Sequence, residues 1–164
     1  MMNRLVIALA LSVLGSLPAQ AAEPAPNGLT LPDGYKDWRL LSTHMRSDNN
    51  TMRAVLGNDV AIKAAREGKT NPWPEGSVLA KMVWKARKHA KWDTAVEPGD
   101  FVHAEFMTKD STRFAATGGW GYARWLGQAQ KPYGKDANFA QECMGCHTPV
   151  KDNDWVFTHP VTLP

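Results

Sequence analysis

The feature that most constrains this chain is the pentapeptide Cys143-Met144-Gly145-Cys146-His147, which lies close to the C-terminus. Cys-x-x-Cys-His is the attachment motif of c-type haem. Because the two thiols stand three residues apart, they share one face of a helix and each can add to a haem vinyl group. The histidine then supplies its imidazole to the iron as the proximal ligand. The motif therefore predicts one haem c, attached through Cys143 and Cys146 and ligated by His147.

The position of the motif in the chain narrows this prediction. Only 17 residues follow His147, and none of them is a methionine. The usual electron carrier, with an early motif and a methionine ligand far downstream, is therefore disfavoured, and an open sixth coordination position is expected. Two other interpretations are weaker. A thioredoxin-like redox pair requires a βαβ context that the sequence does not show. A zinc site would need ligands from the other histidines, which are His44, His89, His103 and His159.

The N-terminus has the three parts of a secretory signal peptide. Met1–Arg4 is short and positive, Leu5–Leu17 is apolar but too short to span a bilayer comfortably, and Ala19–Ala21 is a small-residue cleavage site. We therefore expect residues 1–21 to be removed and the protein to reside in the bacterial periplasm, where c-type haem is attached. Residues 22–30 are expected to form a flexible linker, and residues 31–164 a single haem domain.

The composition excludes several classes of partner. The formal net charge is only +3, and Lys and Arg are not concentrated in one tract, so neither nucleic acid nor a membrane is an expected partner. Both cysteines belong to the haem motif, so no structural disulfide is expected. Stability must then come from a packed core, which the hydrophobic content of 43% and the seven tryptophans can supply.

Hydrophobic alternation and turn residues predict an α+β, mainly β fold, namely an antiparallel sheet with a few short helices. The clearest strands are Ser77–Lys85 and Asp100–Lys109, joined by a charged connector. Helices are predicted at Asp59–Glu67, capped by Asn58 or Asp59, and from Asp136 to the haem motif, where Pro149 should end the helix. A four-helix cytochrome c′ is excluded, because residues 70–127 lack long heptad helices. Further extended segments are expected at residues 35–45, 51–56 and 118–127.

The two clearest strands carry ionisable residues on otherwise apolar faces. Because side chains alternate along a strand, Lys81 lies between Leu79 and Val83 on one face. On the second strand, His103 and Glu105 share a face with Phe101 and Met107. Such faces favour a second buried layer around a cofactor pocket, in which Lys81 and Glu105 must be paired or in contact with a ligand. The alternative is that both are surface charges of edge strands.

In seven stretches that occur in order, the chain resembles the cytochrome P460 family. The resemblance covers most of the mature chain. It implies a mainly β fold, usually a homodimer, with a five-coordinate haem c. It also implies oxidation of hydroxylamine to nitrous oxide or, with oxygen present, to nitrite and nitric oxide, with a soluble redox partner such as a small cytochrome c. The stretches are Arg46–Arg53, Leu56–Ala61, Pro72–Gly76, Leu79–Lys81, His103–Met107, Thr117–Gly121 and Cys143–Val150.

The same resemblance implies roles for individual residues. Lys81 matches a lysine whose nitrogen is bonded to a meso carbon of the porphyrin, so it counts among the cofactor-binding residues. Glu105 matches a distal carboxylate that takes part in catalysis. A distal arginine is also expected, for which Arg53 fits best and Arg46 is the second choice.

Two alternative functions stay open on the sequence. A sister group, the β-type cytochromes c′, shares the fold, lacks the lysine bond, caps the distal side with phenylalanine and binds nitric oxide without turnover. Phe101 and Phe106 are candidates for that cap. The other alternative is a plain electron carrier in which His103 or Met107 is the sixth iron ligand.

Overall fold

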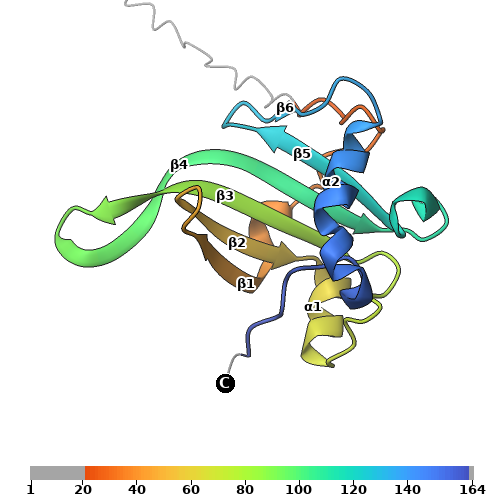
Figure 1. Ribbon diagram of the computed structural model, residues 1–164, viewed down its shortest axis with the longest axis horizontal. Coiled ribbons are helices and arrows are strands. Elements are labelled where there is room, and N and C mark those ends of the chain that lie inside the picture. The colour runs from red at the N-terminus through yellow and green to blue at the C-terminus, as the bar shows by residue number, and fades with distance from the viewer. Residues whose placement is uncertain (1–20, 163–164) are drawn as a thin grey trace, which may run out of the picture.

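The computed structural model describes residues 21–162, which form a six-stranded antiparallel sheet with its strands in chain order (Figure 1). The predicted α+β, mainly β architecture is confirmed. The strands are β1 (Arg39–Arg46), β2 (Thr51–Gly57), β3 (Val78–His89), β4 (Trp92–Lys109), β5 (Trp120–Leu126) and β6 (Lys131–Pro132). The helices are α1 (Asp59–Arg66) and α2 (Phe139–His147), with short 3-10 helices η1 (Tyr35–Asp37), η2 (Ala115–Thr117) and η3 (Thr148–Asn153).

The hairpin of β3 and β4 is longer than the sequence predicts, and it projects from the body of the sheet (Figure 1). The charged segment expected to be a connector continues both strands, with Arg87 opposite Glu97 and an ion pair of 2.9 Å between them. Both faces of a two-stranded ribbon meet water, so charged residues suit it, and the apolar alternation used for prediction disappears. Pro98 fits within β4 because the register shifts nearby.

The two α-helices occur where they were predicted. The cap of α1 agrees with the prediction, whereas both boundary signals of α2 differ from it. Asn58 caps α1, since its side-chain oxygen accepts a hydrogen bond from the Ala61 N–H at 3.0 Å. Asp136 was expected to cap α2, but its carboxylate accepts from the Asn138 N–H and the helix begins at Phe139. Pro149 does not end helical structure either. It occupies the first turn of η3, where a missing N–H is tolerated.

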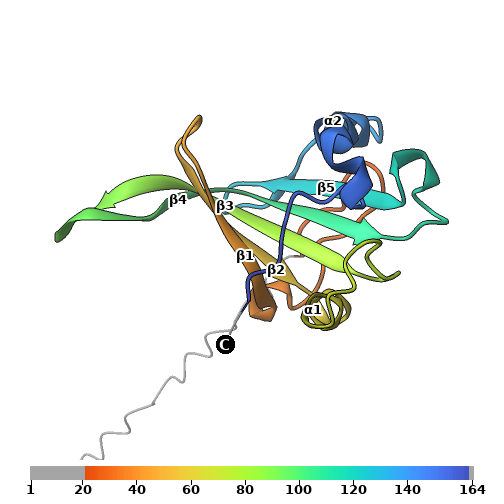
Figure 2. The same ribbon diagram turned by 60° about the horizontal axis from the view of Figure 1, so that its bottom comes forward.

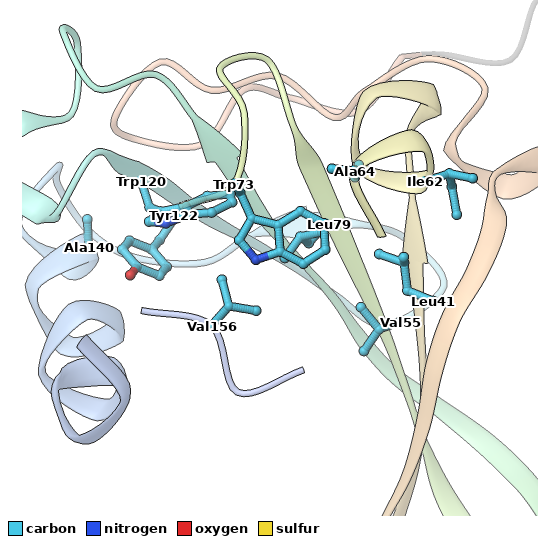
Figure 3. Close-up of a cluster of buried hydrophobic side chains, with 11 residues drawn as sticks. Leu41, Val55, Ile62, Ala64, Trp73, Leu79, Trp120, Tyr122, Ala140 and Val156 are labelled. Atoms are coloured by element: carbon cyan, nitrogen blue, oxygen red, sulfur yellow. The ribbon is translucent and has the colours of Figure 1, made fainter. Parts of the chain in front are cut away.

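Each face of the sheet packs against a separate hydrophobic cluster, as the alternation in β3 and β4 predicts. Ala80, Met82, Ala104 and Phe106 belong to a cluster on one face, and Leu79 belongs to the cluster on the other. The second cluster also holds Trp73, Trp120 and Tyr122, and Val156 from the segment after η3 points toward them (Figure 3). Helix α2 lies over this part of the sheet (Figure 2).

The segment before η1 packs against the sheet. Ala25 and Leu29 are 3% and 8% exposed. The Trp125 Nε1–H donates to the Glu23 carbonyl at 2.9 Å, and Asn27 Nδ2 donates to the Tyr122 carbonyl at 2.8 Å. Glu23, Ala25, Asn27 and Leu29 belong to the segment 22–30, for which a composition rich in Pro, Ala and Asn suggested a flexible linker. The predicted signal peptide, residues 1–21, lies outside the described residues except for Ala21. Within residues 21–162, no helix is long and apolar enough to cross a membrane.

Candidate haem site

A cavity of about 790 Å³ lies between the sheet, α2 and the segment after η3. Its size falls in the range of roughly 300–1,000 Å³ that is usual for small-molecule and cofactor sites. Residues of β1 to β5 line one wall, which we call the sheet wall. The other wall, which we call the ligand wall, is formed by α2 and residues 156–158.

Lys81, Glu105 and Arg124 form a charged cluster on the sheet wall. In the register, Glu105 of β4 lies opposite Lys81 of β3 and opposite Arg124 of β5. Both cations contact its carboxylate: Lys81 forms an ion pair with Oε2, and Arg124 Nε donates to Oε1 at 2.7 Å. The Glu105 side chain is only 18% exposed. The sequence-based expectation that Lys81 and Glu105 are paired rather than separate surface charges is therefore confirmed.

The two cations change the acid–base chemistry of Glu105. Burial alone would raise the pKa of this carboxyl group, but the charges of Lys81 and Arg124 outweigh burial and lower the pKa to about 2. Glu105 is thus anionic at neutral pH and a weak base while both cations face it. An apolar pocket alone would make Glu105 a stronger base, but the two neighbouring cations prevent this.

His103 lies beside Glu105 on the same strand face, with 3.3 Å between Nε2 and Glu105 Oε1. Burial lowers the pKa of His103 to about 4, although the neighbouring carboxylate opposes this shift. The imidazole is therefore neutral at pH 7. Met107, the other residue considered as a sixth ligand, also lines the cavity.

The arginines of the site differ from the sequence-based expectation in one respect. Arg53 lines the cavity, and its Nε is buried without a hydrogen-bond partner. Arg46 also borders the cavity, but it is exposed and its Nε donates to Asp48 at 2.8 Å. Arg124 was not predicted. Only the pairing of β4 with β5 reveals that Arg124 reaches Glu105. In the sequence, an arginine within an aromatic strand does not indicate which residue it will contact.

The ligand wall presents the haem motif. Cys143 is half-buried and Cys146 is exposed, and both line the cavity together with His147. His147 Nδ1 hydrogen-bonds to the Trp155 carbonyl at 2.6 Å, so Nδ1 carries the proton and Nε2 stays free to bind a metal. The ring lies edge-on to Tyr122 and Phe157, with centroids 5.3 and 5.1 Å away. Burial lowers the pKa of His147, which keeps the imidazole in the neutral form that a metal requires.

Comparison with known families decides the class of protein. The family model of cytochrome P460 matches residues 32–158, which is most of the chain. The chain belongs to the cytochrome P460 family. A search of curated proteins found no match. Membership of the cytochrome P460 family makes the protein a c-type cytochrome, implies a haem cofactor, and is consistent with an oxidoreductase.

The residues of the cavity fit the haem of a cytochrome P460. Two thiols on one helix face stand beside a histidine whose free nitrogen is Nε2, and this donor set is the one that haem c needs. Arg53 and Tyr122 also line the cavity, and each has a buried polar atom without a hydrogen-bond partner, which accords with a bound group that has polar edges. Within residues 21–162 no three His, Cys, Asp or Glu side chains are grouped as a metal-ion site, so the zinc interpretation gains no support.

The phenylalanines considered for a β-type cytochrome c′ lie elsewhere. The Phe106 residue borders the cavity, but its ring is buried on the opposite face and packs edge-on against Tyr35 and Trp125. Phe101 packs against Trp84, with ring centroids 5.9 Å apart. Neither ring therefore caps the cavity, whose sheet wall carries the Lys81–Glu105–Arg124 cluster among apolar side chains such as Leu79 and Met107.

Proposed function

We propose that this protein is a periplasmic cytochrome that oxidises hydroxylamine, with nitrous oxide, or nitrite and nitric oxide, as products. A single haem c would be attached through Cys143 and Cys146 and ligated by His147. The observation that supports this function best is the Lys81–Glu105–Arg124 cluster on the sheet wall of the same cavity. A site for binding a neutral diatomic gas alone would not need three buried or half-buried charges.

Each residue of the cluster has a separate role in this proposal. The haem, when bound, supplies the iron that holds the substrate nitrogen and takes up its electrons. Glu105 accepts hydrogen bonds from the N–H and O–H groups of hydroxylamine and then takes up the protons that oxidation releases. Arg53, which lines the cavity, supplies an N–H donor for an oxygen of the substrate or product. Arg124 holds Glu105 in place through its hydrogen bond.

Lys81 has a second role, as the residue that forms a covalent bond from its Nζ to the cofactor. The position of Lys81 on the cavity wall supports this assignment. A nitrogen bonded to an aromatic carbon no longer carries a full positive charge toward Glu105. The pKa of Glu105, which the free ammonium group lowers, would then rise toward its usual range. The cross-link would in this way make Glu105 a stronger base.

The function is tested with the purified holoprotein, hydroxylamine and an artificial one-electron acceptor. We expect consumption of hydroxylamine and formation of nitrous oxide in the absence of oxygen. Tight binding of nitric oxide without consumption of hydroxylamine would instead assign the protein to the β-type cytochromes c′. A low-spin spectrum that does not change when either ligand is added would indicate an electron carrier.

Mass spectrometry of the digested holoprotein tests the cross-link. If Lys81 is bonded to the haem, the haem is found joined to a Lys81 peptide as well as to the Cys143–Cys146 peptide.

The physiological setting completes the proposal. We expect the mature protein to begin after Ala21, to act as a homodimer and to pass its electrons to a soluble redox partner such as a small cytochrome c. N-terminal sequencing of the protein from periplasmic extracts checks the location and the cleavage site. Light scattering of the holoprotein checks the oligomeric state.

A further inference from the structure

The carbonyl that accepts the His147 hydrogen bond belongs to an irregular turn. Asp154 and Trp155 have φ values of +49° and +63°, in the left-handed region that side-chain-bearing residues rarely adopt. Asp tolerates this region, whereas Trp155 is strained, because its Cβ comes too close to the following carbonyl oxygen. A turn of this kind persists only when its surroundings fix it firmly. The position of the Trp155 carbonyl therefore depends on what holds residues 154 and 155.

Asp154 supplies most of the contacts that hold this turn. Its Oδ1 forms an ion pair of 2.6 Å with Lys109 Nζ, and its Oδ2 accepts from the Trp73 N–H at 2.8 Å. The Asp154 carbonyl accepts from the Trp120 Nε1–H at 2.8 Å. The Lys109 and Asp154 side chains are 6% and 9% exposed. One residue thus connects the turn to the loop before β3, to the end of β4 and to the start of β5.

The turn is also closed from its other side. The Trp155 N–H donates to the Val150 carbonyl at 3.0 Å. The Trp155 indole lies so close to Gly118 that a Cβ there would be 2.4 Å from its Nε1. With Asp154 fixed to the sheet and the indole confined by Gly118, the Trp155 carbonyl has little freedom to move away from His147.

We propose that Asp154 is a positioning residue for the proximal iron ligand, acting through the Trp155 carbonyl on His147. This inference rests on the proposed ligation of haem by His147. A hydrogen bond from Nδ1 to a fixed carbonyl sets the ring orientation and raises the basicity of Nε2. A more basic ligand donates more charge to iron and favours the ferric state. Asp154 touches neither the substrate nor the metal, and its effect reaches the iron only through that hydrogen bond.

The test uses the haem-saturated protein and the Asp154→Asn variant. Asparagine tolerates the left-handed region and keeps the side-chain shape, but it loses the ion pair with Lys109. Two quantities are measured, namely the iron–histidine stretching frequency by resonance Raman spectroscopy and the reduction potential. We expect the frequency to fall and the ferric-to-ferrous ratio to change by up to about tenfold toward ferrous, which is the low end of the 10–100-fold effects on metal affinity or activity that follow loss of a ligand's own hydrogen-bond partner. That change is a rise of about 59 mV in potential.

Two further variants make the test decisive. Asp154→Gly suits the positive φ and removes the carboxylate altogether, so it takes the place of Asp154→Asn if that variant does not retain haem. Ile62→Ala, in α1, is the matched control, because it creates a cavity in the buried cluster and lowers the melting temperature without touching the turn. The inference is wrong if the Asp154 variants lower the melting temperature, as Ile62→Ala does, but keep the wild-type stretching frequency and potential. A wild-type spectrum without an iron–histidine band would instead contradict the ligation by His147.

Discussion

The sheet wall and the ligand wall of the cavity are built by different means. The sheet wall carries charged side chains on regular strands, where the antiparallel register places Lys81 and Arg124 on either side of Glu105. The ligand wall carries a single imidazole, whose orientation depends on a backbone carbonyl in a turn with positive φ values. In the proposed function, the first arrangement controls protons and the second controls the ligand of the haem iron. Substitutions on the two walls should therefore change different observables.

The largest expected effect tests the sheet wall. Glu105→Gln keeps the size of the side chain but removes the carboxylate, so hydroxylamine oxidation should fall by about 10²–10⁴-fold. The iron–histidine stretching frequency should stay at the wild-type value, because nothing on the ligand wall has changed. The measurement is steady-state turnover together with resonance Raman spectroscopy.

Glu97→Gln is the matched control for this prediction. Glu97 lies on the same strand, in the projecting part of the hairpin, and pairs with Arg87 instead of lining the cavity. Its loss should leave turnover unchanged. Wild-type turnover in Glu105→Gln would remove Glu105 from the mechanism, and a shifted frequency would show that the two walls are coupled.

The next effect tests the ligand wall through its packing. Gly118→Ala forces a Cβ to within 2.4 Å of the Trp155 indole at a φ of +70°. We expect a loss of about 3 kcal/mol in the free energy of unfolding, from strain and overpacking together. Gly68→Ala is the control, since Gly68 has a similar φ of +67° with no atom within 4 Å of the added carbon. It should lose only about 1 kcal/mol. Equal losses in denaturant unfolding would show that the Trp155 contact contributes nothing.

The same contrast explains which parts of the protein the sequence predicts. Regular elements follow from local patterns: the strand β2, the helix α1 with its Asn58 cap, and the two faces of β3 and β4 were all expected. The alternation of side chains along β3 and β4 was enough to place Lys81 and Glu105 on the strand faces that line the cavity. The length of the β3–β4 hairpin was missed, because its outer part is solvated on both faces and loses the apolar period.

The unpredicted parts of the site depend on long-range geometry. Arg124 reaches Glu105 through the pairing of β5 with β4, and the loop between these strands does not reveal the register. The turn at Asp154 and Trp155 has no local signal either, because positive φ values are expected at glycine and these residues are held by contacts with distant strands. Predicted roles for Lys81, Glu105, Arg53, Cys143 and Cys146 stay predictions, since they concern chemistry with a bound cofactor.

A smaller effect tests how Arg124 controls Glu105. Replacing Arg124 with Met removes a nearby positive charge, so the pKa of Glu105, now lowered to about 2, should rise. The acidic limb of the pH profile of hydroxylamine oxidation should move to higher pH, by about one unit. Arg87→Met removes an arginine from the exposed hairpin and is the control. An acidic limb that does not move would show that Arg124 only packs beside Tyr133, over whose ring it lies at 4.7 Å.

The smallest effect concerns stability and His103. Burial lowers the pKa of this histidine from the usual 6.5 to about 4. Between these two pH values the unfolded chain binds a proton that the folded protein does not bind, so stability must fall as the pH falls through this window. The full pKa difference corresponds to about 3 kcal/mol. Because the ring is partly exposed, we expect His103 to contribute roughly 2 kcal/mol of the loss. His103→Gln should flatten the dependence of the free energy of unfolding on pH between 6.5 and 4, whereas His89→Gln, at the hairpin turn, should not. If the His103→Gln and wild-type curves run parallel, the pKa of His103 is the same in the folded and unfolded states, and below about pH 6.5 the sheet wall holds one more positive charge beside Glu105 than its geometry indicates.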